Sequence, residues 1–336
     1  MKPDYDVLDD IRSFQRSRVI LTAAELDLFT RLDGASMDAP ALARAIGAAE
    51  RPLTRVLDCL VTYGLLEKAD GRYRTAAPAA ALSDRHPAPV RAMALHSAVM
   101  WRTWSHLTET VRTGVSPARH TADDKDDHAL AAFIGAMHAI GRRVADDVAA
   151  ALDLTPYRRL LDVGGGSGVY TMAFLRRNPR LTGVLFDLPR VTMMAVEWLR
   201  AEGLLDRVTL VGGNFECDEL PGGCDLALLS AITHQNSPEE NRALFAKIRR
   251  ALEPGGTLLV RDHVMDESRT EPAAGAQFAI NMLVSTAGGD TYTFAEYRRD
   301  LEAAGFVEVT WLRSGRERMD GLIAARTPAA AGEGGA

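Results

Sequence analysis

The sequence contains few cysteines and no cysteine pair with metal-binding spacing. Its three cysteines, Cys59, Cys217 and Cys224, are an odd number and lack the CxxC spacing of zinc and redox sites. Neither a disulfide framework nor a zinc site is therefore indicated. We expect the three side chains to be buried as small apolar groups in a reducing compartment.

The sequence also lacks a long apolar run and an excess of positive charge. Its first ten residues, MKPDYDVLDD, are acidic and lack the apolar core of a secretory signal, and no run approaches the length that spans a bilayer. The formal net charge of −6 gives no electrostatic reason to expect a nucleic-acid or anionic-membrane partner. We expect a cytoplasmic protein that acts on a small molecule.

With 336 residues, of which 47% are hydrophobic, the chain is long enough to fold as two domains. Apolar residues recur at helical spacing between Val7 and Arg74, and one such helix is predicted over 52–63 with Gly64 as its C-terminal cap. Two short strand patterns then flank a turn at Asp70 and Gly71. Helices followed by a hairpin predict a winged helix-turn-helix.

Winged helices often bind DNA, and DNA binding requires a basic face that contacts the phosphates. The predicted third helix carries only Arg51 and Arg55 as basic residues, and residues 1–80 contain eleven Lys and Arg against twelve Asp and Glu. That balance provides no basic face for phosphate contacts. We expect the helices to pair with a second copy of the chain instead.

Four segments are predicted from the pattern along the chain. The N-terminal domain with a helical extension covers 1–112, and a polar loop and a long helix, 129–152, make up a connecting segment over 113–152. The acidic run at 122–128 is typical of a solvated surface rather than a metal site. The second domain is expected over 153–326, and a disordered tail over 327–336.

From Arg159 onward, short apolar runs alternate with helical patterns, which predicts an α/β fold with a parallel sheet and a terminal pair of strands. The first strand ends in a glycine-rich turn that contains Gly164, Gly166 and Gly168. Such a turn at the carboxyl edge of a sheet lets a ligand approach the backbone closely. The third glycine of a dinucleotide fingerprint is missing, because Val169 occupies its position.

Two carboxylates flank this glycine turn. Asp162 lies beside it, where it would repel a pyrophosphate and attract a ligand that carries an ammonium and a sulfonium group. S-adenosyl-L-methionine (SAM) is such a ligand. Asp187 closes the second strand, at the usual position of a carboxylate that accepts hydrogen bonds from both ribose hydroxyls.

Several motifs together resemble those of the plant-type and bacterial small-molecule O-methyltransferases. They are LLDVGGGSG, FDLP, GNF, LLSAITH and LEPGGTLLVRD in the second domain, and AAELDLF, LTRVLDCLVTYGLL and YRT in the first. The resemblance covers nearly the whole chain. It implies a winged-helix dimerisation domain, a Rossmann-like class I methyltransferase domain with a seven-stranded sheet, a homodimer, and SAM as the cofactor.

The resemblance also assigns site residues. The implied cofactor-binding set is Asp162, Gly164, Gly166, Gly168, Asp187, Leu188, Asn214, Phe215 and Ser230. Asn214 and Phe215 would flank the adenine, with Asn214 standing where the family commonly has Asp, and Ser230 would lie near the methionine end. Met137, Met282 and Trp104 would face an aromatic or polycyclic acceptor substrate.

His234 matches the position of the catalytic histidine of the family, and a neutral imidazole can accept a hydroxyl proton. The family usually continues His-Asp-Trp, whereas this chain continues with Gln235 and Asn236. Of the two acidic residues that bracket the histidine in plant enzymes, the first aligns with Asp262 and the second falls at Thr291. We expect His234 to be the base and Asp262 to orient it. His263 is expected on the opposite face.

Three other functions remain open at this stage. The same fold could methylate nitrogen or carbon, or use SAM without methyl transfer. A SAM-sensing DNA-binding regulator is suggested only by the winged helix, and a NAD-dependent oxidoreductase would need the glycine that Val169 replaces.

Overall fold

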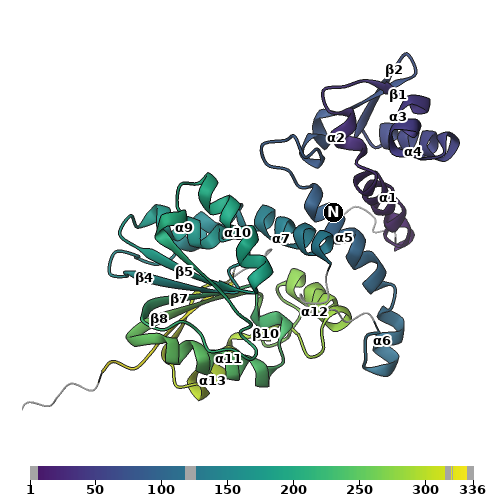
Figure 1. Cartoon of the computed structure of the whole chain (residues 1–336). Helices are drawn as coiled ribbons and strands as arrows, with labels where there is room; N and C mark the ends of the chain where they lie inside the picture. The colour runs from purple at the N-terminus through teal and green to yellow at the C-terminus, as the bar shows by residue number, and fades with distance from the viewer. Residues whose placement is uncertain (1–6, 118–125, 315–318, 320, 331–336) are drawn as a thin grey trace, which may run out of the picture. The chain divides into compact units, whose positions relative to one another are not determined.

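The structure, a computed structural model, describes residues 7–117, 126–314, 319 and 321–330. The chain forms two compact units, which Figure 1 shows in one ribbon. The first unit comprises the described residues up to Arg102 together with Asp127–Ala139, and the second comprises those of Thr103–Asp126 and of the chain from Ile140 onward. The predicted acidic run over 122–128 falls largely outside the described residues, as does the end of the predicted tail, 331–336.

Helices and a small antiparallel sheet form the first unit. Its elements are α1 (Val7–Glu25), α2 (Leu28–Leu32), β1 (Met37–Asp38), α3 (Ala39–Ile46), α4 (Glu50–Thr62), β2 (Leu66–Ala69), β3 (Arg72–Thr75), the 3-10 helix η1 (Ala77–Leu82), most of α5 (Arg91–Trp104) and most of α7 (Asp127–Gly141). The strands pair in the order β1-β3-β2. Asp70 and Gly71 have φ of 48° and 73°, the left-handed conformation that a two-residue hairpin turn requires. The predicted winged helix is confirmed.

Apolar side chains from the helices and the hairpin form the core of this unit. Phe29, Leu57, Leu60 and Tyr73 are at most 1% exposed. One apolar stripe of α1 is exposed in the part of the chain that the structure describes. Its members lie on one helical face and are each more than half exposed: Val7, Leu8, Ile11 and Phe14.

One segment predicted as a single helix is divided in two, because the predicted long helix over 129–152 consists of α7 and α8 (Ala145–Ala150). The prediction of a continuous helix there was wrong. The helical extension before residue 112 is helical as expected and consists of α5 and α6 (Leu107–Thr113). Each break lies within a few residues of a boundary between the two units, where the chain leaves one core and enters the other.

A seven-stranded sheet forms the centre of the second unit, as the family resemblance implied. Its strands are β4 (Arg159–Val163), β5 (Thr182–Asp187), β6 (Val208–Gly212), β7 (Cys224–Ser230), β8 (Leu252–Asp262), β11 (Val307–Arg313) and β12 (Gly321–Arg326), in the order β11-β12-β8-β7-β4-β5-β6. Strands β4 to β8 are parallel, and β12 runs antiparallel to both β8 and β11. The strand order reverses at β4, and open α/β sheets bind ligands at the carboxyl edge of such a point.

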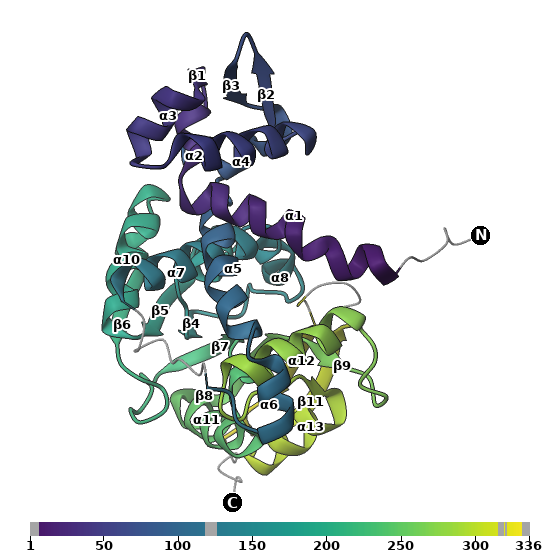
Figure 2. The ribbon, with the colours of Figure 1, turned by 90° about the vertical axis from the view of Figure 1, so that its right-hand side faces the viewer.

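Helices cover both faces of this sheet (Figure 1 and Figure 2). The helices α8, α9 (Val169–Arg177) and α10 (Pro189–Ala201) pack on one face, and α11 (Pro238–Ala251) and α13 (Phe294–Ala303) pack on the other. The remaining elements are η2 (Leu205–Arg207), η3 (Thr233–Gln235), β9 (Val264–Met265), α12 (Ala273–Ser285) and β10 (Tyr292–Thr293). No helix among the described residues has the length and apolar character needed to cross a membrane.

Two further expectations can be compared with the structure. All three cysteines are free thiols, but only Cys224 is buried; Cys59 is half-buried and Cys217 is exposed, so the expectation of three buried cysteines was wrong. Thr327, the first residue of the predicted tail, is 5% exposed and its backbone N–H donates to the carbonyl of Gly256 over 2.9 Å.

Candidate active site

The glycine-rich turn joins β4 to α9 at the carboxyl edge of the sheet. Gly164, Gly166 and Gly168 all have positive φ, between 56° and 76°, which L side chains rarely adopt. The N–H of Gly164 donates to the carbonyl of Phe186 over 2.8 Å, which ties the turn to β5. A Cβ on Gly166 would meet no atom within 4 Å. The turn is therefore joined to β5, and the space beside Gly166 is open to a ligand.

The two predicted carboxylates lie beside this turn. Asp187, at the end of β5, accepts hydrogen bonds from the N–H groups of Gly166 and Leu188, both over 2.7 Å, and Asp162 accepts one from the Thr171 hydroxyl over 2.6 Å. Burial raises the pKa of each carboxyl to about 6, although these hydrogen bonds act in the opposite direction. Burial thus outweighs the hydrogen bonds of both carboxylates. Next to an open turn, they favour a ligand with a positive charge and hydroxyl donors.

The predicted adenine side is a short turn after β6. The Oδ1 atom of Asn214 accepts a hydrogen bond from the N–H of Glu216 over 2.9 Å, and the Asn214 N–H donates to Asp218 over 2.8 Å. The ammonium of Lys247, on α11, donates to the carbonyls of Phe215, Glu216 and Asp218 at 2.8 to 3.0 Å. Lys247 thus fixes the turn that carries Phe215, and nothing in the sequence pattern identified it.

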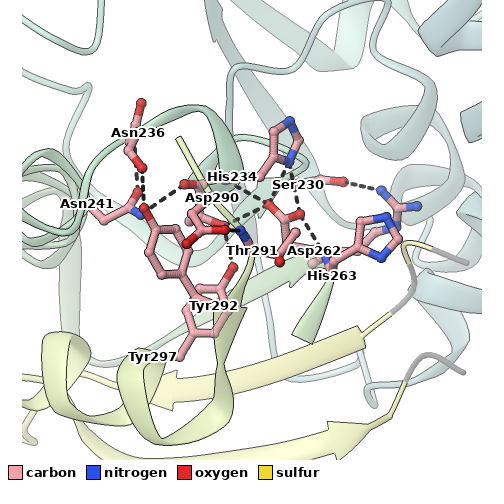
Figure 3. A network of polar contacts seen from close by, with 12 residues as sticks. Ser230, His234, Asn236, Asn241, Asp262, His263, Asp290, Thr291, Tyr292 and Tyr297 are labelled. Carbon is pink, nitrogen blue, oxygen red and sulfur yellow. Dashed lines mark hydrogen bonds and ion pairs between the residues drawn. The ribbon is translucent and has the colours of Figure 1, made fainter. Parts of the chain in front are cut away.

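His234 and Asp262 form a close pair at the ends of β7 and β8, and Figure 3 shows the network around them. The Nδ1 atom of His234 lies 2.9 Å from Oδ1 and 3.0 Å from Oδ2 of Asp262. Asp262 is 1% exposed, and its carboxylate also accepts hydrogen bonds from the N–H groups of His234 and His263 and from the Thr233 hydroxyl.

Burial raises the pKa of Asp262, but the nearby His234 and these hydrogen bonds outweigh burial and lower it below its ordinary value. Asp262 is therefore an ionised carboxylate that can only accept hydrogen bonds. Nδ1 of His234 must therefore donate to Asp262, and in the neutral form of the ring Nε2 holds the free electron pair.

Two hydroxyl groups extend this pair into the core. The Oγ1 atom of Thr233 lies 2.7 Å from Oδ2 of Asp262 and 2.6 Å from the hydroxyl oxygen of Tyr297. Because a hydroxyl has one hydrogen and Asp262 can only accept, Thr233 donates to Asp262 and Tyr297 donates to Thr233. Sequence reasoning missed both residues.

The turn that carries His234 is held by polar contacts and by the start of α11. Asn241 donates to the carbonyl of Thr233 over 2.9 Å, and the Tyr292 hydroxyl donates to the carbonyl of Asn236 (Figure 3). Ser237 caps α11 in a reciprocal pair of hydrogen bonds with Glu240, an arrangement typically worth ~1 kcal/mol. These contacts fix the backbone of the turn.

Thr291, the second predicted partner of His234, is 2% exposed. Its N–H donates to Asp290 over 2.8 Å and its carbonyl accepts from Arg269 over 2.9 Å, and among the described residues no hydrogen bond joins it to His234. Asp290 itself pairs with Arg269 over 3.4 Å. Asp262 is therefore the only carboxylate that the described residues place against the His234 ring, and a catalytic role for Thr291 stays a prediction.

Aromatic and apolar residues of α12 lie next to the pair. The ring of Phe278 meets the His234 ring edge-on at 4.8 Å between centroids and lies 5.0 Å from that of His263. The strand alternation that predicted His263 on the opposite face does not apply, because β8 ends at Asp262. Phe278 was not singled out from the sequence.

The predicted substrate-facing residues are divided between the two units. Met282 is 6% exposed on α12, and the indole N–H of Trp104 donates to Asn281 of the same helix over 3.0 Å. Met137 lies on α7 in the first unit, and its role at the site stays a prediction. Ser230, at the end of β7, is 8% exposed and accepts a hydrogen bond from Arg261 over 3.3 Å.

Two family models match the chain. An O-methyltransferase domain matches residues 104–307, and an O-methyltransferase dimerisation domain matches residues 8–84. The first match alone covers more than half of the sequence.

Individual relatives agree with the family models. The chain is 34% identical over 319 residues to the 3-hydroxy-5-methyl-1-naphthoate 3-O-methyltransferase of Streptomyces sahachiroi, covering 92% of this chain and 91% of that protein. It is 35% identical over 312 residues to the tetracenomycin polyketide synthesis 8-O-methyl transferase of Streptomyces glaucescens, covering 90% and 91%. The solved structure of the mitomycin 7-O-methyltransferase is similar to it with a TM-score of 0.83 and 31% identity, covering 96% of this chain and 97% of that one. The chain therefore belongs to the O-methyltransferase family and is a SAM-dependent O-methyltransferase.

Proposed function

We propose that this enzyme methylates a phenolic hydroxyl of an aromatic or polyketide-derived small molecule, with His234 as the general base. One observation carries the base assignment: the Nδ1 atom of His234 lies 2.9 Å from a buried ionised carboxylate, which leaves Nε2 free to accept a proton. The names of the relatives support the acceptor class, because one names a hydroxynaphthoate and the other names tetracenomycin polyketide synthesis.

The residues at the glycine turn fit SAM. The open space beside Gly166 admits a ligand to the backbone, Asp187 has lone pairs for ribose hydroxyls beyond its two backbone donors, and Asp162 places negative charge near the ligand ammonium. Asn214 and Phe215 are proposed to flank the adenine, and Ser230 to lie at the methionine end. Bound SAM supplies an electrophilic methyl group on a sulfonium.

The protein's own part in the reaction is positioning and proton transfer. An acceptor hydroxyl held in line with the methyl group loses its proton to Nε2 of His234, and the resulting imidazolium is stabilised by Asp262 over 2.9 Å. The hydrogen bonds from Thr233 and from the His263 N–H hold the Asp262 carboxylate in place. Phe278, Met282 and Trp104, all in the second unit, are proposed to form an apolar wall against which an aromatic acceptor packs.

We also propose a cytoplasmic homodimer with no nucleic-acid partner. The dimerisation-domain match over residues 8–84 and the exposed apolar stripe of α1 support the dimer. In the first unit the described basic and acidic side chains are interspersed, as in the pairs Lys68 with Asp58 and Arg74 with Glu67, and do not form a basic face.

Replacing His234 by Ala tests the base assignment. A hydroxynaphthoate is incubated with SAM, and the O-methylated product is identified by mass spectrometry and NMR. Loss of a general base is expected to lower turnover by roughly 10²- to 10⁴-fold while the affinity for S-adenosylhomocysteine (SAH), measured by titration calorimetry, stays within about twofold. The control is His86→Ala, at a histidine of the first unit. Turnover of His234→Ala within a few-fold of the unmodified enzyme would remove His234 as the base.

A further inference from the structure

Arg261 is a buried cation at the carboxyl edge of the sheet. It precedes Asp262 on β8, so its side chain leaves the opposite face of the strand, and its register partner on β7 is Ser230. Arg261 is 3% exposed. Its guanidinium lies over the Tyr170 ring, 5.2 Å from the centroid, and its Nη1 donates to Ser230 over 3.3 Å. Its Nε atom is buried and has no hydrogen-bond partner.

No described residue supplies a negative charge to this guanidinium. Among the described side chains, no carboxylate forms an ion pair with Arg261. Asp162 is bonded to Thr171, and Asp262 is paired with His234 on the other side of the strand. Tyr170 remains a neutral phenol, because burial raises its pKa despite the nearby Arg261. Burying a charge without a counter-ion lowers the stability of a folded protein. The contribution of Arg261 to the stability of the fold therefore does not explain why it is buried here.

The location of Arg261 indicates where the counter-ion comes from. Ser230, which bonds to Arg261, ends β7 next to the point where the strand order reverses and was assigned above to the methionine end of SAM. A planar guanidinium binds a carboxylate through paired hydrogen bonds. We infer that Arg261, together with Ser230 and Tyr170, is a recognition site for a ligand carboxylate, and that the α-carboxylate of SAM occupies it. This inference rests on the proposed SAM site.

The test compares two ligands that differ only in the carboxylate, SAM and decarboxylated SAM, by titration calorimetry. Arg261→Gln is expected to weaken SAM binding at least tenfold and to leave binding of decarboxylated SAM within twofold. The matched control is Arg250→Gln, because Arg250 is half exposed and pairs with Glu219 on the surface. If the unmodified protein binds neither SAM nor SAH, the proposed function itself fails, and that result is distinct from any effect of Arg261.

Thermal unfolding separates ligand recognition from a structural role. Removing a buried charge that has no counter-ion does not remove a stabilising pair, so ligand-free Arg261→Met is expected to unfold at the same temperature as the unmodified protein or higher. The rise in Tm on adding SAH is expected to be smaller in the variant. Arg261→Lys, which keeps the charge but loses the paired donors, is expected to retain part of that rise. A ligand-free Tm lowered by many degrees, with the SAH-induced rise intact, would assign Arg261 to the fold instead.

An acceptor carboxylate is the other source of the same chemistry. The second arm of the experiment therefore measures binding of 3-hydroxy-1-naphthoate and of 2-naphthol to the SAH complex of each variant. An effect of Arg261→Gln on the naphthoate alone, with SAM affinity unchanged, would keep the carboxylate site and assign it to the acceptor. The inference is overturned if Arg261→Gln changes neither the affinity for SAM relative to decarboxylated SAM nor the affinity for 3-hydroxy-1-naphthoate relative to 2-naphthol.

Discussion

The hydroxyl of Thr233 joins the pair of His234 and Asp262 to the protein core. It donates to Asp262 over 2.7 Å and accepts from Tyr297 over 2.6 Å, and both residues are less than 3% exposed. Among the described residues, Asp262 is the only carboxylate against the His234 ring, because Thr291 stands where the resemblance places a second acid. The hydrogen bonds that hold Asp262 therefore decide how firmly His234 is oriented. Thr233 is thus a positioning residue that acts through Asp262.

Thr233→Val keeps the shape of the side chain and removes the hydroxyl. Asp262 loses one of the hydrogen bonds that lower its pKa, and Tyr297 loses its acceptor, so the free energy of unfolding at pH 7 is expected to fall by about 1–3 kcal/mol. A carboxyl whose pKa is lowered by folding contributes stability above its ordinary pKa, and this contribution is lost as the pH falls through the lowered value. The difference from the unmodified protein should therefore be larger at pH 7 than near pH 3.

Urea unfolding at the two pH values measures this difference, and turnover of Thr233→Val should fall while SAH affinity is kept. Thr233→Ser retains the hydroxyl and is expected to restore most of both quantities. An equal loss of stability at pH 7 and pH 3 would show that the hydroxyl does not act through the charge of Asp262.

Sequence reasoning reached only part of this network. His234 and Asp262 were identified because each lies in a motif that the family shares, and the structure brings their side chains within 3.0 Å. Thr233 and Tyr297 are 64 residues apart, and Arg261 meets Tyr170 across different elements. Contacts of this kind depend on tertiary packing and leave no spacing pattern in the sequence.

The ends of β4 and β5, with the turn between β4 and α9, carry the two carboxylates that are proposed to form the anionic part of the cofactor site. Burial raises the pKa of Asp162 and of Asp187 to about 6, and the charge of Asp187 contributes to the raised pKa of Asp162. In the ligand-free protein a raised pKa stabilises the fold at low pH, and this contribution is lost as the pH rises through about 6. A ligand with a positive charge, in contrast, binds these two carboxyls in their ionised form.

SAH binding is therefore expected to weaken as the pH falls. If only the ionised form of a group with a pKa near 6 binds the ligand ammonium, the dissociation constant rises about tenfold between pH 7 and pH 5. Titration calorimetry of SAH across this range measures it. Asp162→Asn is expected to bind more weakly at pH 7 and to show a flatter pH dependence. An SAH affinity that does not change between pH 5 and pH 7 would contradict the assignment of these carboxylates to the cofactor.

Elements defined by local signals were predicted well, and elements defined by tertiary context were not. Helix α9 begins at Val169, directly after the predicted glycine turn, because that turn marks its start. The break between α7 and α8 was missed, because the apolar spacing of Ile140, Val144 and Val148 continues across it. A Cβ on Gly141 would lie 2.6 Å from Val169, so close packing at the end of α7 requires glycine there, and periodicity does not report such a requirement.

The fold of each unit followed from the sequence, whereas assembly depends on a surface that only the structure defines. The α1 stripe, Val7, Leu8, Ile11 and Phe14, is an apolar face on a helix of 19 residues within the dimerisation-domain match. The charges of this helix are mixed, with Asp9 and Asp10 in its first turn and Arg12, Arg16 and Arg18 further along. The match to the dimerisation domain favours a second copy of the chain as the partner that covers the α1 stripe.

Ile11, 61% exposed, is the most exposed member of the α1 stripe, and Ile11→Asp places a charge in the proposed interface. Burying an unpaired carboxylate costs several kcal/mol, so the dimer dissociation constant is expected to rise by at least about 100-fold. Light scattering after size-exclusion chromatography, over a range of protein concentrations, measures it. Arg12→Asp, at the next residue and on another face of α1, should leave the dimer intact. A dimer that persists in Ile11→Asp would place the interface elsewhere on the chain, while equal dissociation of both variants would attribute the effect to charge rather than to the apolar stripe.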